Sequence, residues 1–197
     1  MAYLPNGAIE KILIPIAQNR YRSGSQSLDY RDDLISRGYG FYSFYETTVA
    51  IAGKKYLEFV SPSDKYFALN FRQVITDQER LFYNVYVNYT GITPAASIRI
   101  GNLKSDSANA SGSTYTETTG TPVLTNAIRV THLPVFGSVN AGNRASGSLV
   151  GDSVFRLIAP NSTFLIELDN QSVDPIYVAL ELIWAEIPQE IIIEGGF

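Results

Sequence analysis

One histidine and a small set of carboxylates are the residues of this chain that could support catalysis. His132 is the single histidine, and there is no cysteine. A Ser–His–Asp triad would have to use His132, yet no serine lies in a GxSxG motif. His132 shares a strand face with Ile128 and Val130, which predicts a packed, hydrogen-bonded side chain. We therefore expect no catalytic residue, and the lack of cysteine excludes disulfides, zinc–thiolate sites and a thiol nucleophile.

Acidic residues are the other candidates, because two carboxylates at a suitable separation can hydrolyse a glycosidic bond. Glu167 and Glu181 fall on the polar faces of two predicted strands, where salt bridges or solvent contact explain them. Calcium-loop spacing and phosphate-binding glycine motifs are absent from the sequence. We therefore expect no metal site and no cofactor. A hydrolase with paired carboxylates remains a third hypothesis, for which the candidates are Asp64, Glu79, Asp152, Glu167 and Glu181.

The clearest structural pattern is the stretch Ala159–Glu186, which has the alternation of two strands joined by a polar turn. Successive side chains of a strand leave opposite faces, so residues two apart share a face. This spacing predicts a hairpin whose buried rows are Phe164, Ile166 and Leu168 on the first strand and Ile176, Val178, Leu180, Leu182 and Trp184 on the second. The polar faces of both strands are expected to be solvated.

Upstream segments repeat this alternation and end in turn residues. Thr47–Ile51 and Lys55–Val60 flank Ala52-Gly53, which predicts a hairpin turn. Lys65–Arg72 and Leu81–Tyr89 are further strands. Seven or eight strands with almost no helix predict an all-β fold, an antiparallel β-sandwich or jelly-roll. Residues 105–121, which contain no aliphatic side chain larger than Ala, are expected to be a long loop or an irregular edge, and 137–153, rich in Gly, Ser and Asn, is expected to be a second loop.

We divide the chain into a β-sandwich domain at residues 47–187, an N-terminal arm at 1–46 and an extended tail at 188–197. The arm contains one predicted short helix, Ser27–Arg37, which Gly38 ends with a left-handed conformation. Its aromatic rings either lie over the core of the same domain or dock on a neighbouring subunit. The candidate interface residues, chosen because Tyr and Arg contribute most at interfaces and the tail is apolar, are Tyr21, Arg22, Tyr39, Tyr42, Tyr45, Ile191, Ile192 and Ile193.

The composition of the chain argues against some classes of binding partner. The net charge of −4 and a pI near 5.0 argue against a general nucleic-acid binder, which needs a basic stripe. Charged residues make up only 17% of the chain, and Ser, Thr, Asn and Gly supply its polarity instead. The N-terminal stretch lacks an export signal, and its apolar run 12–17 is too short to span a bilayer. We expect neither nucleic acid nor membrane as a partner.

In its layout, the chain from about residue 52 to 186 resembles a group of small tailed-bacteriophage virion proteins. The resemblance rests on turn-like motifs: Lys65-Tyr66-Phe67, Gly120–Val123 with Asn126 and Arg129, the glycine-rich Ala141–Gly151, Pro160–Leu165 with Asn170, and Leu182–Glu186. It covers about two thirds of the chain, and the arm and the tail lie outside it. It implies a virion component with a β-sandwich body, attached to the capsid or to the tail and fibre apparatus, and it implies no active site.

The leading hypothesis is therefore a non-enzymatic structural component of a bacteriophage virion. Its expected partners are other virion proteins and copies of itself, in a homo-oligomer for which threefold symmetry is a common choice. The alternative is a carbohydrate-binding module, for example at a fibre tip, that places exposed aromatic rings against the apolar faces of sugars. The tyrosines available for that role are Tyr39, Tyr42, Tyr45, Tyr86 and Tyr115.

Overall fold

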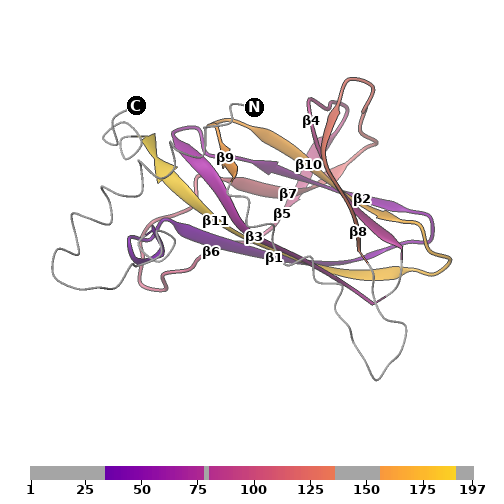
Figure 1. Cartoon of the computed structure of the whole chain (residues 1–197), viewed down its shortest axis with the longest axis horizontal. Coiled ribbons are helices and arrows are strands. Elements are labelled where there is room, and N and C mark those ends of the chain that lie inside the picture. Colours follow the sequence, from indigo (N-terminus) through magenta and orange to yellow (C-terminus); the bar gives the residue numbers. More distant parts are fainter. Residues whose placement is uncertain (1–33, 78–79, 136–155, 190–197) are drawn as a thin grey trace.

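The computed structural model describes residues 34–77, 80–135 and 156–189, and its strands form two antiparallel sheets packed face to face (Figure 1). The β1 sheet consists, in spatial order, of β6 (Ile100–Asn102), β1 (Gly40–Val49), β11 (Ile176–Pro188), β3 (Lys65–Thr76) and β9 (Arg156–Ile158). The β2 sheet consists of β5 (Thr93–Ser97), β7 (Thr114–Thr119), β2 (Lys54–Val60), β10 (Thr163–Asn170), β4 (Leu81–Val87) and β8 (Ile128–Val135). The predicted all-β antiparallel sandwich is confirmed.

The pairing pattern is that of a long hairpin rolled into two layers. β1 pairs with β11, β2 with β10, β3 with β9 and β4 with β8. The first of these eight strands therefore pairs with the last, the second with the second to last, and so on. Successive pairs alternate between the sheets. This is the arrangement of an eight-stranded jelly-roll, which is one of the ways that all-β proteins combine two sheets. β5, β6 and β7 are an insertion between β4 and β8 that extends one edge of each sheet.

The two predicted hairpins are wrong. β10 and β11 lie in different sheets, and so do β1 and β2, which the turn at Ala52 and Gly53 connects across the sandwich. Alternation specifies which face of a strand is buried, but it does not specify the hydrogen-bonded neighbour. The apolar rows of β10 and β11 are both buried in the same core from opposite sides, as the alternation requires.

Trp184 lies at the centre of the core. Its side chain is 0% exposed. Its ring lies 5.3 Å from that of Phe59 at an interplanar angle of 86°, and Phe41 and Phe67 complete an aromatic cluster with centroids 6.3 and 5.9 Å away. Edge-to-face and tilted contacts of this kind add attraction to the burial of apolar area. Phe59 comes from the β2 sheet and Phe41 and Phe67 from the β1 sheet, so the cluster joins both layers.

The predicted loop over residues 105–121 is correct only in its first half. Residues 114–119 form β7, which pairs with β2, and Tyr115 is 1% exposed inside the core. A single aromatic side chain therefore fixes this strand without any large aliphatic residue. The second predicted loop, 137–153, lies outside the described residues.

At the N-terminal side, residues 34–36 are helical and Gly38 adopts a φ of +79°, as predicted for the end of the helix. A Cβ atom at Gly38 would lie 2.2 Å from Ser107 Oγ, so only glycine fits both the backbone and the space. The earlier part of the predicted helix lies outside the described residues. The boundary predicted at residue 46 falls within β1, and the sandwich boundary predicted at 187 falls one residue before β11 ends.

Candidate functional site

The structure places the predicted interface residues in different environments. Tyr42 is 39% exposed on β1, whereas Tyr45 on the same strand is 6% exposed, and its hydroxyl donates to Glu117. Tyr39 is half-buried and packs against a small cluster around Leu34. The remaining predicted interface residues, Tyr21, Arg22, Ile191, Ile192 and Ile193, lie outside the described residues.

The candidate carboxylates do not converge. Glu167 lies on β10 and Glu181 on β11, and both point away from the core, so they occupy opposite outer surfaces of the sandwich. Asp64 is exposed in the turn before β3, and Glu79 and Asp152 lie outside the described residues. Within the described part of the chain, no group of three or more His, Cys, Asp or Glu side chains could hold a metal ion.

Glu167 is the centre of a polar row that crosses the outer face of the β2 sheet. Its side chain is 1% exposed, so of the two explanations expected for this residue the salt bridge is correct and the solvent contact is wrong. Lys54 Nζ lies 3.0 Å from Oε2, while Asn84 Nδ2 donates to Oε1 at 2.8 Å. Tyr86 donates its hydroxyl to the same Oε1 at 3.3 Å. Register explains the row, because Asn84 is the direct partner of Glu167 on β4 and Tyr56 is its partner on β2.

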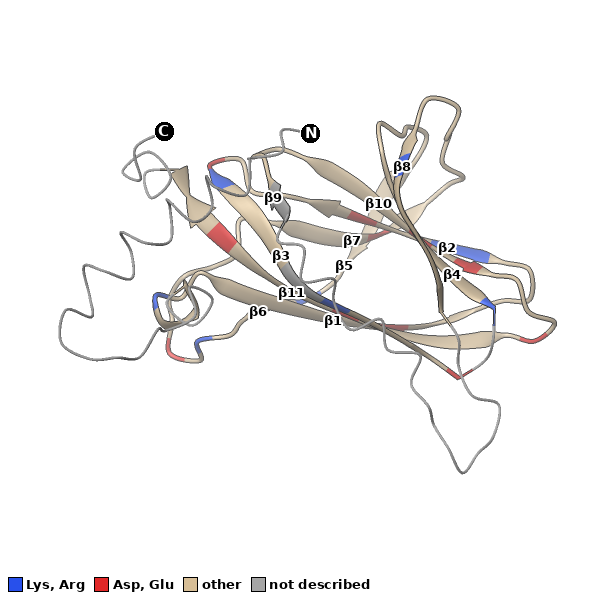
Figure 2. Ribbon diagram, viewed as in Figure 1, with Lys and Arg blue, Asp and Glu red and all other residues tan. Residues whose placement is uncertain are grey.

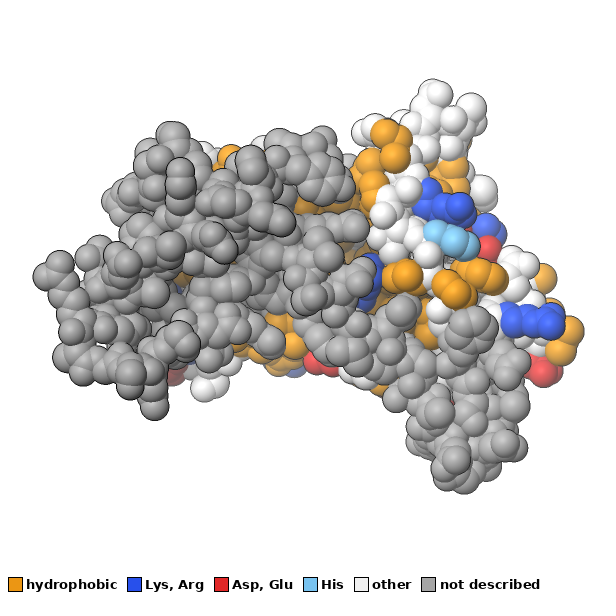
Figure 3. Space-filling model, in the orientation of Figure 1, with side chains coloured by type: hydrophobic (Ala, Val, Ile, Leu, Met, Phe, Trp, Pro, Cys, Tyr) orange, Lys and Arg blue, Asp and Glu red, His pale blue; other side chains and the backbone are white. Residues whose placement is uncertain are grey.

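The row reaches His132 through Asn84. The Asn84 side chain donates to Glu167 through Nδ2, so its Oδ1 must accept from His132 Nδ1, which lies 2.6 Å away. In a neutral His132 this leaves Nε2 as an acceptor. The His132 ring also stacks on Phe82, with centroids 5.2 Å apart and planes 3° from parallel. The histidine is exposed and lies beside basic and hydrophobic side chains on the surface (Figure 3). Its predicted packed position on one face with Val130 is therefore wrong, because Val130 packs against the core, but the predicted hydrogen bond is present.

The buried Glu167 also raises the pKa of the neighbouring tyrosines. Burial and then the negative charge of Glu167 raise the pKa of Tyr56 to about 12. The same two causes, in the same order, raise the pKa of Tyr86. Both effects favour the neutral phenol, because a phenolate beside Glu167 would place two negative charges together.

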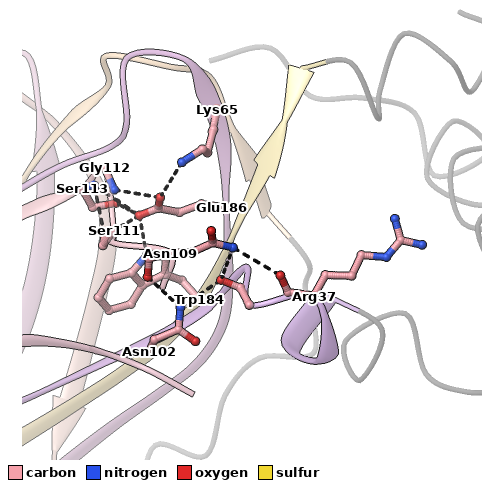
Figure 4. Close-up of polar contacts among 10 residues, drawn as sticks. Arg37, Lys65, Asn102, Asn109, Ser111, Gly112, Ser113, Trp184 and Glu186 are labelled. Atoms are coloured by element: carbon pink, nitrogen blue, oxygen red, sulfur yellow. Dashed lines mark hydrogen bonds and ion pairs between the residues drawn. The ribbon is translucent and has the colours of Figure 1, made fainter. Parts of the chain in front are cut away.

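A second buried carboxylate, Glu186, lies at the end of the core on β11 (Figure 4). Charged residues are sparse over both sheets, which makes a fully buried one unusual (Figure 2). Oε1 accepts from Ser111 Oγ at 2.5 Å, Ser113 Oγ at 2.8 Å and Trp184 Nε1 at 3.3 Å. The other oxygen, Oε2, accepts from the Gly112 amide at 2.9 Å and lies 3.7 Å from Lys65 Nζ.

These bonds attach the loop before β7 to the sandwich. Asn102, the last residue of β6, links the same loop to the turn after the helix, because its Nδ2 donates to Gly38 O at 2.9 Å and to Asn109 O at 3.0 Å. The chemistry is therefore that of an anchor: backbone and hydroxyl donors order a loop that has little apolar area to bury. Sequence reasoning missed this role. Its signal was the position of Glu186, which continues the buried row that ends at Trp184.

Comparisons with protein families, with curated proteins and with solved structures find no significant match to this chain. The fold and the site therefore define a class only: an all-β jelly-roll with two buried carboxylates that fixed donors hold in place. Among the described residues, no helix has the length and apolar character needed to cross a membrane.

Replacing Glu186 with Ala is expected to destabilise the protein by about 3–5 kcal/mol, because several buried donors lose their acceptor while Lys65 loses its partner. Urea unfolding measures the loss. Amide hydrogen exchange should show reduced protection at Gly112 and Ser113. Glu181→Ala is the control on the same strand and should cost less than about 1 kcal/mol. Equal costs for the two variants would show that Glu186 is no anchor.

Replacing Glu167 with Gln is expected to lower the pKa of Tyr56 from about 12 toward 10.0, while burial still keeps it above that value. In the native protein the folded pKa exceeds the unfolded one. The stability that the neutral phenol contributes is therefore complete below pH 10 and is lost as the pH rises toward 12. An NMR titration of the tyrosine Cζ resonances measures the change. Burial and Arg72, not Glu167, perturb the pKa of Tyr83, so its titration should not move.

Proposed function

We propose that this chain is a non-enzymatic structural component of a bacteriophage virion, which decorates the capsid or joins head, tail or fibre parts. The observation that carries the proposal is the rolled-hairpin jelly-roll, because viral capsid domains are among the main users of this architecture. The resemblance of the sequence layout to small tailed-bacteriophage virion proteins favours the same assignment. Fold alone does not determine function, so a structural role also requires a surface through which the protein can contact its partners.

The outer face of the β1 sheet offers a surface for assembly. Tyr42 and Phe44 on β1 are 39% and 51% exposed, and Tyr177 on the neighbouring β11 is 39% exposed and hydrogen-bonds Glu46. We call these three aromatic residues the aromatic strip. Tyr42 and Phe44 are neighbours on the outer face of β1, and Tyr177 lies opposite Thr48, four residues further along, so that the strip runs lengthwise over Glu46. Large exposed aromatic side chains that lie together are typical of protein interfaces.

The sheet edges favour contact through this face rather than through strand addition. The edge strands β6 and β9 of the β1 sheet are only three residues long. Both edge strands of the β2 sheet contain a proline, which is Pro94 in β5 and Pro134 in the eight-residue β8. Short edges and proline both limit pairing with another chain. Association through the aromatic strip would leave the jelly-roll unchanged and would bury side chains that are now in water.

Replacing Phe44 with Asp is expected to weaken self-association or incorporation into particles at least tenfold, because a buried Phe contributes about 1.5–3 kcal/mol. Light scattering measures the oligomeric state of the purified chain. Mass spectrometry of purified particles, from infected cells that produce the variant, measures incorporation. Both readouts work whichever virion protein the chain binds.

The control is Val173→Asp, in the turn between β10 and β11, where Val173 is already 80% exposed. This variant should assemble like the unchanged protein. A purified chain that is a compact monomer and that is absent from particles would contradict the proposal. Unaltered assembly of the Phe44 variant would instead exclude the aromatic strip as the contact surface.

A second candidate function is carbohydrate binding, and the stack of His132 on Phe82 favours it. This surface pair adjoins the polar row of Asn84, Glu167 and Lys54, in which the half-exposed Lys54 can donate to sugar hydroxyls. Of the five tyrosines considered for this role, Tyr45 and Tyr115 lie in the core. Sugar sites combine such a flat apolar surface with a few fixed polar groups.

Replacing Phe82 with Ala is expected to weaken glycan binding by about tenfold, because the stack loses one of its two rings. A glycan array followed by titration of any bound sugar measures the effect. Tyr177→Ala, which removes an exposed aromatic residue from the opposite sheet, serves as the control. An array without signal above background would remove this function.

A further inference from the structure

A β-bulge in β3 turns one arginine toward the space between the sheets. The register of β3 against β11 shifts between Ile183 and Trp184, where Trp184 pairs with Leu69 and Ile183 with Phe71. Beyond this shift, Arg72 is the partner of Leu182, a core residue, and therefore shares its inward face. The shift leaves one additional residue in β3 between Leu69 and Phe71. Without it, the alternation that starts at Leu69 would place Arg72 on the outer face of the sheet. Bulges that redirect one side chain are concentrated near functional sites.

Arg72 lines a cavity of about 70 Å³ between the sheets. Most of the described residues around it are apolar, among them Phe59, Phe67, Val130, Ile158 and Ile166. The polar side chains on its wall are Arg72, Tyr83 and Thr131. No acidic side chain among the described residues lines this cavity, and no described carboxylate forms an ion pair with Arg72.

The guanidinium has one strong contact and one unfulfilled donor. Its Cζ lies 5.1 Å from the centre of the Tyr83 ring, which attracts the cation through its electron-rich face. Nε is buried and has no hydrogen-bond partner. Arg72 as a whole is partly exposed, and arginine stays protonated in proteins, so the positive charge on the cavity wall is permanent. A cation placed against an apolar cavity in this way favours an incoming anion.

We propose that this cavity binds a small carboxylate ligand, whose carboxylate lies on Nε of Arg72 and whose short alkyl group lies among the apolar side chains. The charge complements the guanidinium, which forms strong hydrogen bonds to carboxylates. The volume sets the size of the alkyl group. About 70 Å³ is roughly half of an engineered 150 Å³ cavity that takes benzene, so the cavity holds about three carbon atoms. Butyrate has this size and charge and is the probe for the test.

The first experiment adds butyrate to the full chain and follows the methyl resonances by NMR. Methyl groups of Val130, Ile158 and Ile166 should shift in a saturable manner, while those of the exposed Val173 should not. Butanol, which has a similar length and no charge, should bind at least about tenfold more weakly, because it forms no charge-assisted hydrogen bond. Chloride should leave the cavity methyls unchanged, because it has no apolar group to occupy the cavity.

The second experiment compares Arg72→Met with Arg129→Met. Met keeps much of the apolar volume of Arg and removes the charge, so Arg72→Met should weaken butyrate binding at least about tenfold. Arg129 is exposed on β8, and its replacement should leave binding unchanged. The proposal would be overturned if butyrate did not shift the cavity methyl resonances, or if butanol bound as tightly as butyrate. It would also be overturned if chloride shifted these resonances as butyrate does, or if Arg72→Met bound butyrate as tightly as the unchanged protein. Should Arg72→Met not fold, the comparison of butyrate with butanol and chloride on the unchanged protein still decides.

Discussion

The contact between the two sheets at Trp184 is the interaction on which the rest of the structure depends. Its ring meets Phe59 from the facing sheet and Phe41 and Phe67 from its own, and none of it is exposed. Two sheets with one apolar face each are stable only when these faces cover one another. Without cysteine, no disulfide can replace that burial. The strand pairs, the crossing turns and the loops are all positioned relative to this aromatic cluster.

Two buried carboxylates lie where the structure changes from apolar to polar side chains. Glu186, two residues after Trp184 on the same row, closes the end of the core by binding Ser111, Gly112 and Ser113 of the loop before β7. Glu167 performs a similar task on the outer face of the β2 sheet, where Lys54 and Asn84 hold it. In both cases fixed donors compensate the cost of burying a charge. Of the candidate surfaces for partners, the aromatic strip lies on the outer face of the β1 sheet, whereas the His132 stack adjoins the Glu167 row through Asn84.

Much of the fold follows from alternation. The buried rows of β10 and β11 are those that the spacing predicts, and Gly38 ends the helix as expected. Less of the candidate site was predictable. Neither the row from Glu167 to His132 nor the anchor at Glu186 joins residues close in the chain: Asn84 and Glu167 are 83 positions apart, and Ser113 and Glu186 are 73 apart. Local patterns contain no information about such pairs.

The sequence by itself determined that this is an all-β protein and determined which apolar rows of β10 and β11 face the core. The period of two is a property of the extended backbone, so it holds whatever the strand pairs with. Only the tertiary structure decided that β10 and β11 lie in opposite sheets, that Glu167 is dry and that Arg72 faces the cavity. These outcomes depend on strand pairing and on one inserted residue, and both are selected by how the two apolar faces cover each other across the whole chain.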